Sequence, residues 1–157
     1  MKLITILSVL LGTAALSAQI LTPAHWSSRL SKEAIRPGET VELIFSVRLD
    51  RNWHLYSNVQ NYKIGPLPAV FEFKPHSSYK LLEGVVAIGS QKEYDPVFEV
   101  YVNYFENTAE FRQKVKILSK NPIIKGFYEY QVCSIADGKC VMGTGDFEFK
   151  IQTIKQI

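Results

Sequence analysis

The chain has 157 residues, the length of a single domain, and is long enough to bury a hydrophobic core without disulfide support. Apolar residues make up 46% of the chain and charged residues 21%, ordinary values for a globular protein that do not favour disorder. The formal net charge of +3 is small and its residues are scattered, so nucleic acid is not expected as a partner.

The N-terminus has the organisation of a secretory signal peptide. Met1-Lys2 supplies a positive start, Leu3 to Leu11 is almost wholly apolar, and Gly12 to Ala18 is small and apolar. We expect cleavage near Ala18, which leaves residues 19–157 as one exported domain, in the periplasm or an equivalent compartment, with no stable membrane insertion. The alternative is a retained N-terminal anchor, because a membrane span needs about 20 apolar residues and this run is barely that long.

The mature region carries the alternating pattern of β-strands. In Thr40 to Leu49, every second residue from Val41 onward is apolar, which predicts a strand with one buried face. The remaining strand-like segments are, in chain order, Trp53–Val59, Ala69–Phe73, Tyr79–Leu82, Phe98–Phe105, Ala109–Leu118, Gly126–Val132 and Asp146–Ile151. About eight short strands separated by Gly, Pro, Asn and Asp turns predict an all-β sandwich or barrel.

Cys133 and Cys140 are the only cysteines, and export makes a disulfide between them reasonable to expect. The residues between them include Asp137-Gly138, a strong turn signal, so the simplest arrangement is a hairpin with one cysteine near each strand end. As a structural staple, such a local bridge would contribute roughly 2.5 kcal/mol at most. The residues alone leave open whether the pair is a staple or a reactive disulfide.

Two charged residues bear on the reactivity of this pair. Lys139, next to Cys140, would favour the nucleophilic thiolate, whereas Asp137 would act against it. An ordinary solvated loop lysine is the alternative, and the sequence does not rank the two charges.

Metal and cofactor chemistry is weakly indicated. Three dispersed histidines and two cysteines do not predict a four-ligand zinc site, and a soft Cu(I) site that uses Cys133, Cys140 and Met142 is a minor alternative. Neither a G-x-S-x-G motif nor a phosphate-binding glycine loop occurs, and we expect no cofactor.

Several segments follow one another in an order typical of one protein family. They cover residues 30 to 151 and comprise Trp53-His54-Leu55-Tyr56, Gly65–Phe73, Tyr94–Phe98, Phe105 with Phe111–Val115, and Tyr128–Cys133 with Cys140. Together they resemble the N-terminal periplasmic domain of the thiol:disulfide interchange protein DsbD. The resemblance implies an immunoglobulin-like β-sandwich that passes electrons from a thioredoxin-like donor to periplasmic acceptors. Its partners would be thioredoxin-fold proteins, bound through transient mixed disulfides.

The resemblance also assigns roles to residues. It implies that Cys140 forms the mixed disulfide with the partner, that Cys133 resolves it, and that Tyr56 stands beside the pair. Lys139 would support the thiolate. The family's cap loop, whose aromatic tip often shields the cysteines, corresponds roughly to Gly84 to Ser90 here, a stretch without an aromatic residue, so we expect weaker shielding.

Two further departures from the family are visible. Cys140 is followed by Val141-Met142-Gly143 instead of a proline-containing segment, and the loop between the cysteines is slightly longer. We expect a free-standing unit that meets its donor and acceptor by diffusion. The competing hypothesis is a non-enzymatic secreted β-sandwich that binds a protein or glycan and carries a structural disulfide.

Overall fold

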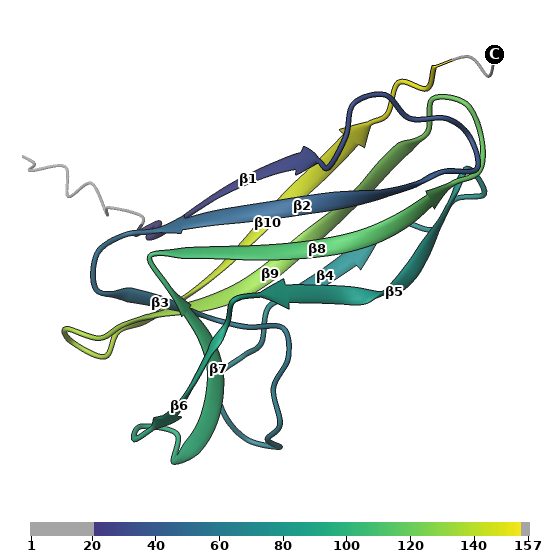
Figure 1. Ribbon diagram of the computed structural model, residues 1–157. Coiled ribbons are helices and arrows are strands. Elements are labelled where there is room, and N and C mark those ends of the chain that lie inside the picture. Colours follow the sequence, from purple (N-terminus) through teal and green to yellow (C-terminus); the bar gives the residue numbers. More distant parts are fainter. Residues whose placement is uncertain (1–20, 155–157) are drawn as a thin grey trace, which may run out of the picture.

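The structure, a computed structural model, describes residues 21–154, and over this range the chain is built from β-strands (Figure 1). The strands are β1 (Ala24–Leu30), β2 (Thr40–Leu49), β3 (Trp53–Tyr56), β4 (Val70–Phe73), β5 (Tyr79–Ile88), β6 (Gln91–Asp95), β7 (Val100–Glu106), β8 (Thr108–Ile117), β9 (Ile123–Ser134) and β10 (Cys140–Lys150). The expected signal peptide lies outside the described residues. Within residues 21–154 there is no helix long and apolar enough to cross a membrane.

The strands form two sheets that pack face to face as an immunoglobulin-like sandwich (Figure 1). One sheet has the order β1-β2-β8-β5, and the other has the order β10-β9-β3-β7-β6 with β4 paired to β9. Neighbouring strands are antiparallel in both sheets. The prediction of an all-β, immunoglobulin-like sandwich is therefore confirmed.

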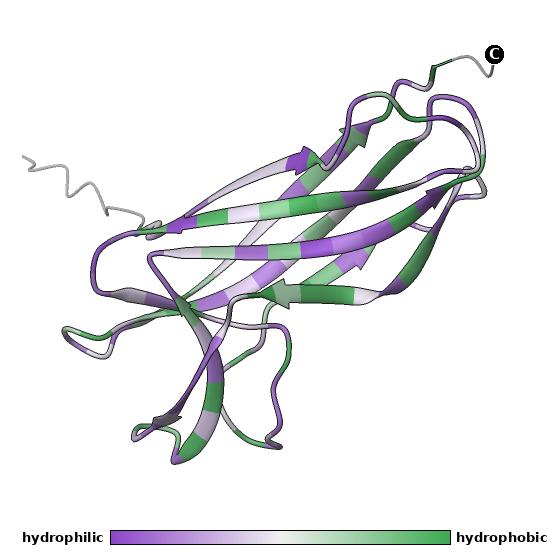
Figure 2. Cartoon of the chain, viewed as in Figure 1, coloured by the Kyte–Doolittle hydropathy of each residue, from purple (hydrophilic) through white to green (hydrophobic). Residues whose placement is uncertain are grey.

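The strands with strong alternation were the ones predicted well. β2 has the expected bounds, and along it and β8 the buried side chains recur at every second position. Figure 2 shows the corresponding apolar and polar bands. β1 and β6 were not predicted, because both lie at sheet edges and most of their residues are exposed. Such edges have little buried surface to impose a period-2 pattern.

The core between the sheets is rich in aromatic rings. Phe45 of β2 lies opposite Phe111 of β8 in the register, and the Phe45 ring packs 5.0 Å from Phe71 and 4.9 Å from Phe147 of the facing sheet, measured between ring centroids. Aromatic pairs at such separations add to the stability that burial alone supplies. This core holds the two sheets together independently of the cysteines.

A second, smaller cluster lies apart from this core, where the β6–β7 hairpin extends beyond the sandwich (Figure 1). Its buried members are Tyr56, Val102, Tyr104 and Cys133. The loop after β3 is fastened to the hairpin by Gln60, whose side-chain amide bonds both the carbonyl (2.7 Å) and the N–H (2.9 Å) of Asn103. The hairpin is thereby held beside the strand end that carries Cys133.

Candidate functional site

The two cysteines close the β9–β10 hairpin. Cys133 and Cys140 are direct cross-strand partners, their Cα atoms are 4.1 Å apart, and their sulfurs form a disulfide. The loop between them turns at Gly138, which has a positive φ of 71° that suits glycine. The predicted hairpin, with one cysteine at each strand end, is confirmed.

The two cysteines differ in their exposure to solvent. Cys133 is only 4% exposed, because β9 lies between β10 and β3 in the sheet. Cys140 is exposed, because it begins β10, which is the edge strand. A second protein can therefore approach the sulfur of Cys140 more readily than that of Cys133.

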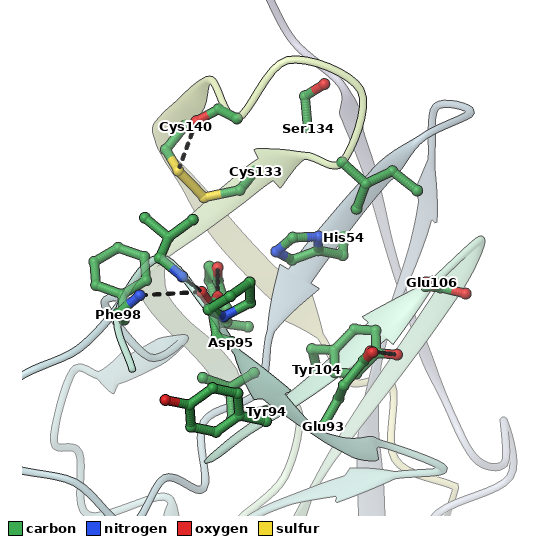
Figure 3. A pocket seen from close by; sticks show the side chains of 16 residues that line it. His54, Glu93, Tyr94, Asp95, Phe98, Tyr104, Glu106, Cys133, Ser134 and Cys140 are labelled. Carbon is green, nitrogen blue, oxygen red and sulfur yellow. Dashed lines mark hydrogen bonds between the residues drawn. A yellow bond between two sulfur atoms is a disulfide. The ribbon is translucent and has the colours of Figure 1, made fainter. Parts of the chain in front are cut away.

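A cavity of about 290 Å³ adjoins the disulfide (Figure 3). Both cysteines line it, and so do side chains from β3, β6, β7 and the segment after β6. The described lining includes His54, Tyr56, Glu93, Tyr94, Asp95, Phe98, Tyr104, Glu106 and Ser134. Three of the four predicted site residues, Cys133, Cys140 and Tyr56, thus share one cavity.

Asp95 organises the segment that lies beside the disulfide. One oxygen of its carboxylate accepts a hydrogen bond from the Tyr56 hydroxyl (2.9 Å), and the other accepts bonds from the backbone N–H groups of Val97 (2.8 Å) and Phe98 (3.2 Å). The Phe98 ring stands edge-on to Tyr56, with 6.5 Å between the centroids. Tyr56 therefore holds this turn in place from the buried side.

This arrangement corrects the expectation for the cap loop. Most of the stretch from Gly84 to Ser90 belongs to β5, which runs to Ile88 and pairs with β8 beyond an irregularity between Leu82 and Val86. The segment that shares the cavity with the cysteines is Glu93 to Phe98, and it carries two aromatic residues. The prediction was wrong because the polar strand β6 was not recognised, so the loop was placed too early in the chain.

Two tyrosine hydroxyls in the cavity act as hydrogen-bond donors. Burial and the bond to Asp95 raise the pKa of Tyr56 far above its ordinary value. The hydrogen bond from Tyr104 to Glu93 (2.7 Å), together with burial, raises the pKa of Tyr104 to about 12. Both tyrosines are neutral at physiological pH, and each donates a hydrogen bond to a carboxylate of the cavity.

His54 and Gln131 complete the surroundings of Cys133, and neither was singled out from the sequence. His54 of β3 is the cross-strand partner of Cys133, and burial lowers its pKa despite the carboxylates of Asp95, Glu106 and Glu93. The side-chain amide of Gln131 lies 3.5 Å from the Cys133 sulfur. Its position two residues before Cys133, on the same face of the strand, was the signal that could have found it.

Lys139, the fourth predicted residue, does not line the cavity. Its ammonium group is 2.9 Å from the Asp137 carboxylate, and its side chain is 72% exposed. The hydrogen bond from Lys139 is the main reason why the pKa of Asp137 falls to about 2. The two loop charges thus offset each other instead of acting separately on Cys140.

The described residues show no gathering of potential metal ligands. Within residues 21–154 no three His, Cys, Asp or Glu side chains are grouped to hold a metal ion. Met142, the third ligand of the Cu(I) alternative, is 71% exposed and lies in a different surface hollow from the one beside the disulfide.

The site is thus that of a β-sandwich with a hairpin disulfide exposed on one side. The sequence matches the family described as "Thiol:disulfide interchange protein DsbD, N-terminal" over residues 25–151, and the chain belongs to this family. Its membership and its disulfide support a function in thiol–disulfide interchange. A search of curated proteins found no match.

Three solved structures to which this chain is similar come from Proteus mirabilis and Neisseria meningitidis. The N-terminal periplasmic domain of ScsB from Proteus mirabilis is 9% identical with a TM-score of 0.53, covering 82% of this chain and 45% of that one. The reduced DsbD N-terminal domain of Neisseria meningitidis is 17% identical with a TM-score of 0.47, covering 73% and 78%. A complex of the DsbD and PilB N-terminal domains from the same organism is 16% identical with a TM-score of 0.46, covering 80% of each chain. At these identities, the ScsB likeness shows the fold alone.

Proposed function

We propose that the protein is a periplasmic electron carrier that exchanges disulfides with thioredoxin-fold proteins through Cys133 and Cys140. The observation that carries the proposal is the unequal exposure of the two cysteines, since Cys140 is exposed at a sheet edge and Cys133 is only 4% exposed beside a cavity. A staple needs no such difference. An exchange site needs one sulfur that a partner reaches and one that it does not.

In the reduced protein, the Cys140 thiolate attacks one sulfur of the acceptor's disulfide. A bond forms between Cys140 and that sulfur, and the acceptor's second sulfur leaves as a thiolate and takes a proton. Cys133 then loses its proton and attacks Cys140, which forms the internal disulfide and releases the acceptor as a dithiol. Two electrons have passed to the acceptor, and a donor dithiol reverses the sequence. No cofactor takes part.

Tyr56 and Lys139 have supporting roles in this proposal. Tyr56 fixes the turn beside the disulfide through Asp95 and so governs how far the sulfurs are covered. Lys139 favours the Cys140 thiolate only to the extent that Asp137, its ion-pair partner, leaves its charge uncompensated.

The reduction potential of the disulfide tests the function directly. Equilibration with dithiothreitol or glutathione buffers should give a potential above about −300 mV, the range of labile disulfides. A lower potential, together with resistance to a reduced thioredoxin-fold donor, would instead indicate a structural disulfide in a binding module.

The roles of the two cysteines can be separated by trapping. Cys133→Ala removes the resolving thiol, so mixed disulfides with thioredoxin-fold proteins should accumulate on non-reducing gels and disappear with dithiothreitol. Cys140→Ala is the matched control and should trap far less. A reversed pattern would exchange the two roles but keep the function.

Export is tested by the mass of the protein recovered from the periplasm. The apolar N-terminal run predicts a mature chain that begins near Gln19. A mass that still includes residues 1–18 would contradict cleavage.

A further inference from the structure

Gln131 is a buried polar residue whose side chain connects Cys133 to the loop between β3 and β4. It lies on β9 two residues before Cys133, on the same face of the strand, and is 8% exposed. Its amide nitrogen is 3.5 Å from the Cys133 sulfur, and its amide oxygen is 2.7 Å from the backbone nitrogen of Leu67. Both ends of the amide are therefore in contact with a partner.

The contact with Leu67 fixes which end of the amide faces the sulfur. A backbone N–H can only donate, so the group next to Leu67 has to be the amide oxygen. The NH₂ group then points at Cys133. The backbone N–H of Leu67 thus fixes the orientation of the Gln131 amide, with its NH₂ group directed at the Cys133 sulfur.

A donor at this position matters because of the other groups around Cys133. The ionisable groups that line the cavity with Cys133 come from β3, β6, β7 and β10, and they are His54, Tyr56, Glu93, Tyr94, Asp95, Tyr104, Glu106 and Cys140. The hydroxyls of Tyr56 and Tyr104 donate to Asp95 and Glu93, and the carboxylates oppose any additional negative charge. In the disulfide-bonded protein the Gln131 amide donates to the Cys133 sulfur, and the same donor is in place to serve a Cys133 thiolate.

We propose that Gln131 is the positioning residue of the resolving thiol, and that its amide stabilises the Cys133 thiolate which releases the partner from Cys140. This inference rests on the proposed exchange function. In the step concerned, Cys133 first gives its proton to solvent. Its thiolate then attacks Cys140, the new Cys133–Cys140 bond forms as the bond from Cys140 to the partner's sulfur breaks, and the partner leaves as a thiolate that takes a proton from solvent.

The size of the effect follows from two opposing trends. Loss of one donor should move the titration midpoint of the Cys133 thiol to higher pH by roughly one unit, which lowers the thiolate fraction at pH 7 about tenfold. A more basic thiolate is also more nucleophilic, by about threefold for such a change. We therefore expect the release step to be roughly threefold to fourfold slower at pH 7.

Two substitutions remove the donor. Gln131→Glu keeps an oxygen for the Leu67 N–H but replaces the NH₂ group with a carboxylate oxygen, whose negative charge would raise the thiol midpoint further. Gln131→Met removes both polar ends at nearly the same size without adding a charge, so it measures the loss of the donor itself. Gln113→Met is the matched control, because Gln113 is also buried (2% exposed) but donates to the Leu82 and Lys114 carbonyls, away from the cysteines.

The first measurement uses protein that carries Cys140→Ala, in which Cys133 is the sole thiol. Thiolate absorbance against pH should show a higher midpoint in both Gln131 variants and no change in Gln113→Met. The second measurement uses the otherwise unaltered chain with glutathione disulfide as the probe. Starting from the reduced protein, the rate of formation of the Cys140–glutathione mixed disulfide should be unchanged in the Gln131 variants. The release of glutathione from this mixed disulfide should be slower, and its rate profile should be shifted to higher pH.

An unchanged midpoint and release rate in either folded Gln131 variant overturns the inference. If neither variant folds, the side-chain NH₂ resonances of the unaltered protein decide. Those of Gln131 should shift on reduction more than those of Gln113, and equal shifts overturn the inference. Failure of the exchange function would appear separately, as a reduction potential below about −300 mV in the unaltered protein. The thiol titration and the glutathione kinetics can be measured whatever that potential is, so the two failures are distinguishable.

Discussion

The hydrogen bond between Tyr56 and Asp95 offers the sharpest test of how the cavity is built. Tyr56→Phe removes only the hydroxyl, which donates to the carboxylate at 2.9 Å from a side chain that is 1% exposed. Hydrogen bonds to charged groups contribute about 1.5–3 kcal/mol, but Asp95 is only half-buried and water can replace the lost donor. We therefore expect the free energy of unfolding of the oxidised protein to fall by about 1–1.5 kcal/mol.

The same change should loosen the turn that carries Phe98 and expose the disulfide. Urea denaturation measures the stability, and the rate of disulfide reduction by dithiothreitol measures the exposure, which should rise. Tyr79→Phe is the control, because the Tyr79 hydroxyl bonds a backbone carbonyl at Lys74, outside the cavity, and its loss should leave the reduction rate unchanged. A Tyr56→Phe protein with unaltered stability and unaltered reduction rate would refute this account of the turn.

Three further perturbations have expected outcomes. Replacing both Cys133 and Cys140 with Ser should leave far-UV circular dichroism and a cooperative thermal transition intact, with a stability loss of no more than roughly 2.5 kcal/mol, because the hairpin already holds its ends together; an unfolded double variant would favour the staple. Burial lowers the pKa of His54 in the folded protein, so just below its ordinary pKa of about 6.5 the unfolded chain binds more protons than the folded chain. The free energy of unfolding should therefore decrease as the pH is lowered through this range, and it should level off once the pH is below the pKa of His54 in the folded protein. His54→Phe should flatten that part of the stability profile, and an unchanged profile would contradict the assignment. Asp137→Asn should speed alkylation of reduced Cys140 and Lys139→Gln should slow it, each by less than about threefold because the charges are exposed and screened; changes in the same direction would show that the ion pair does not act on Cys140.

Sequence periodicity predicted those strands whose burial is set by one dominant face. In β8, alternate residues from Ala109 to Ile117 are buried, so local pattern and final structure agree. β6 reads Gln91-Lys92-Glu93-Tyr94-Asp95 and has almost no buried face, since it pairs only with β7 at the end of the sheet. Its strand character comes from that partner, which a local pattern does not contain. The misplaced cap loop was a direct consequence.

The unequal exposure of the two cysteines shows the same limit at the site itself. The Asp137-Gly138 turn predicts a hairpin, but a hairpin by itself does not indicate which of its two cysteines is more exposed. The difference arises because β3 joins β9 on the side away from β10, which places His54 opposite Cys133 and leaves Cys140 on a free edge. That pairing joins residues about 80 positions apart in the chain, so no local sequence pattern predicts it. In the proposed mechanism, the cysteine that meets partners and the cysteine beside the Gln131 amide are thus distinguished by sheet order, and exchanging their roles would require a different neighbour for β9.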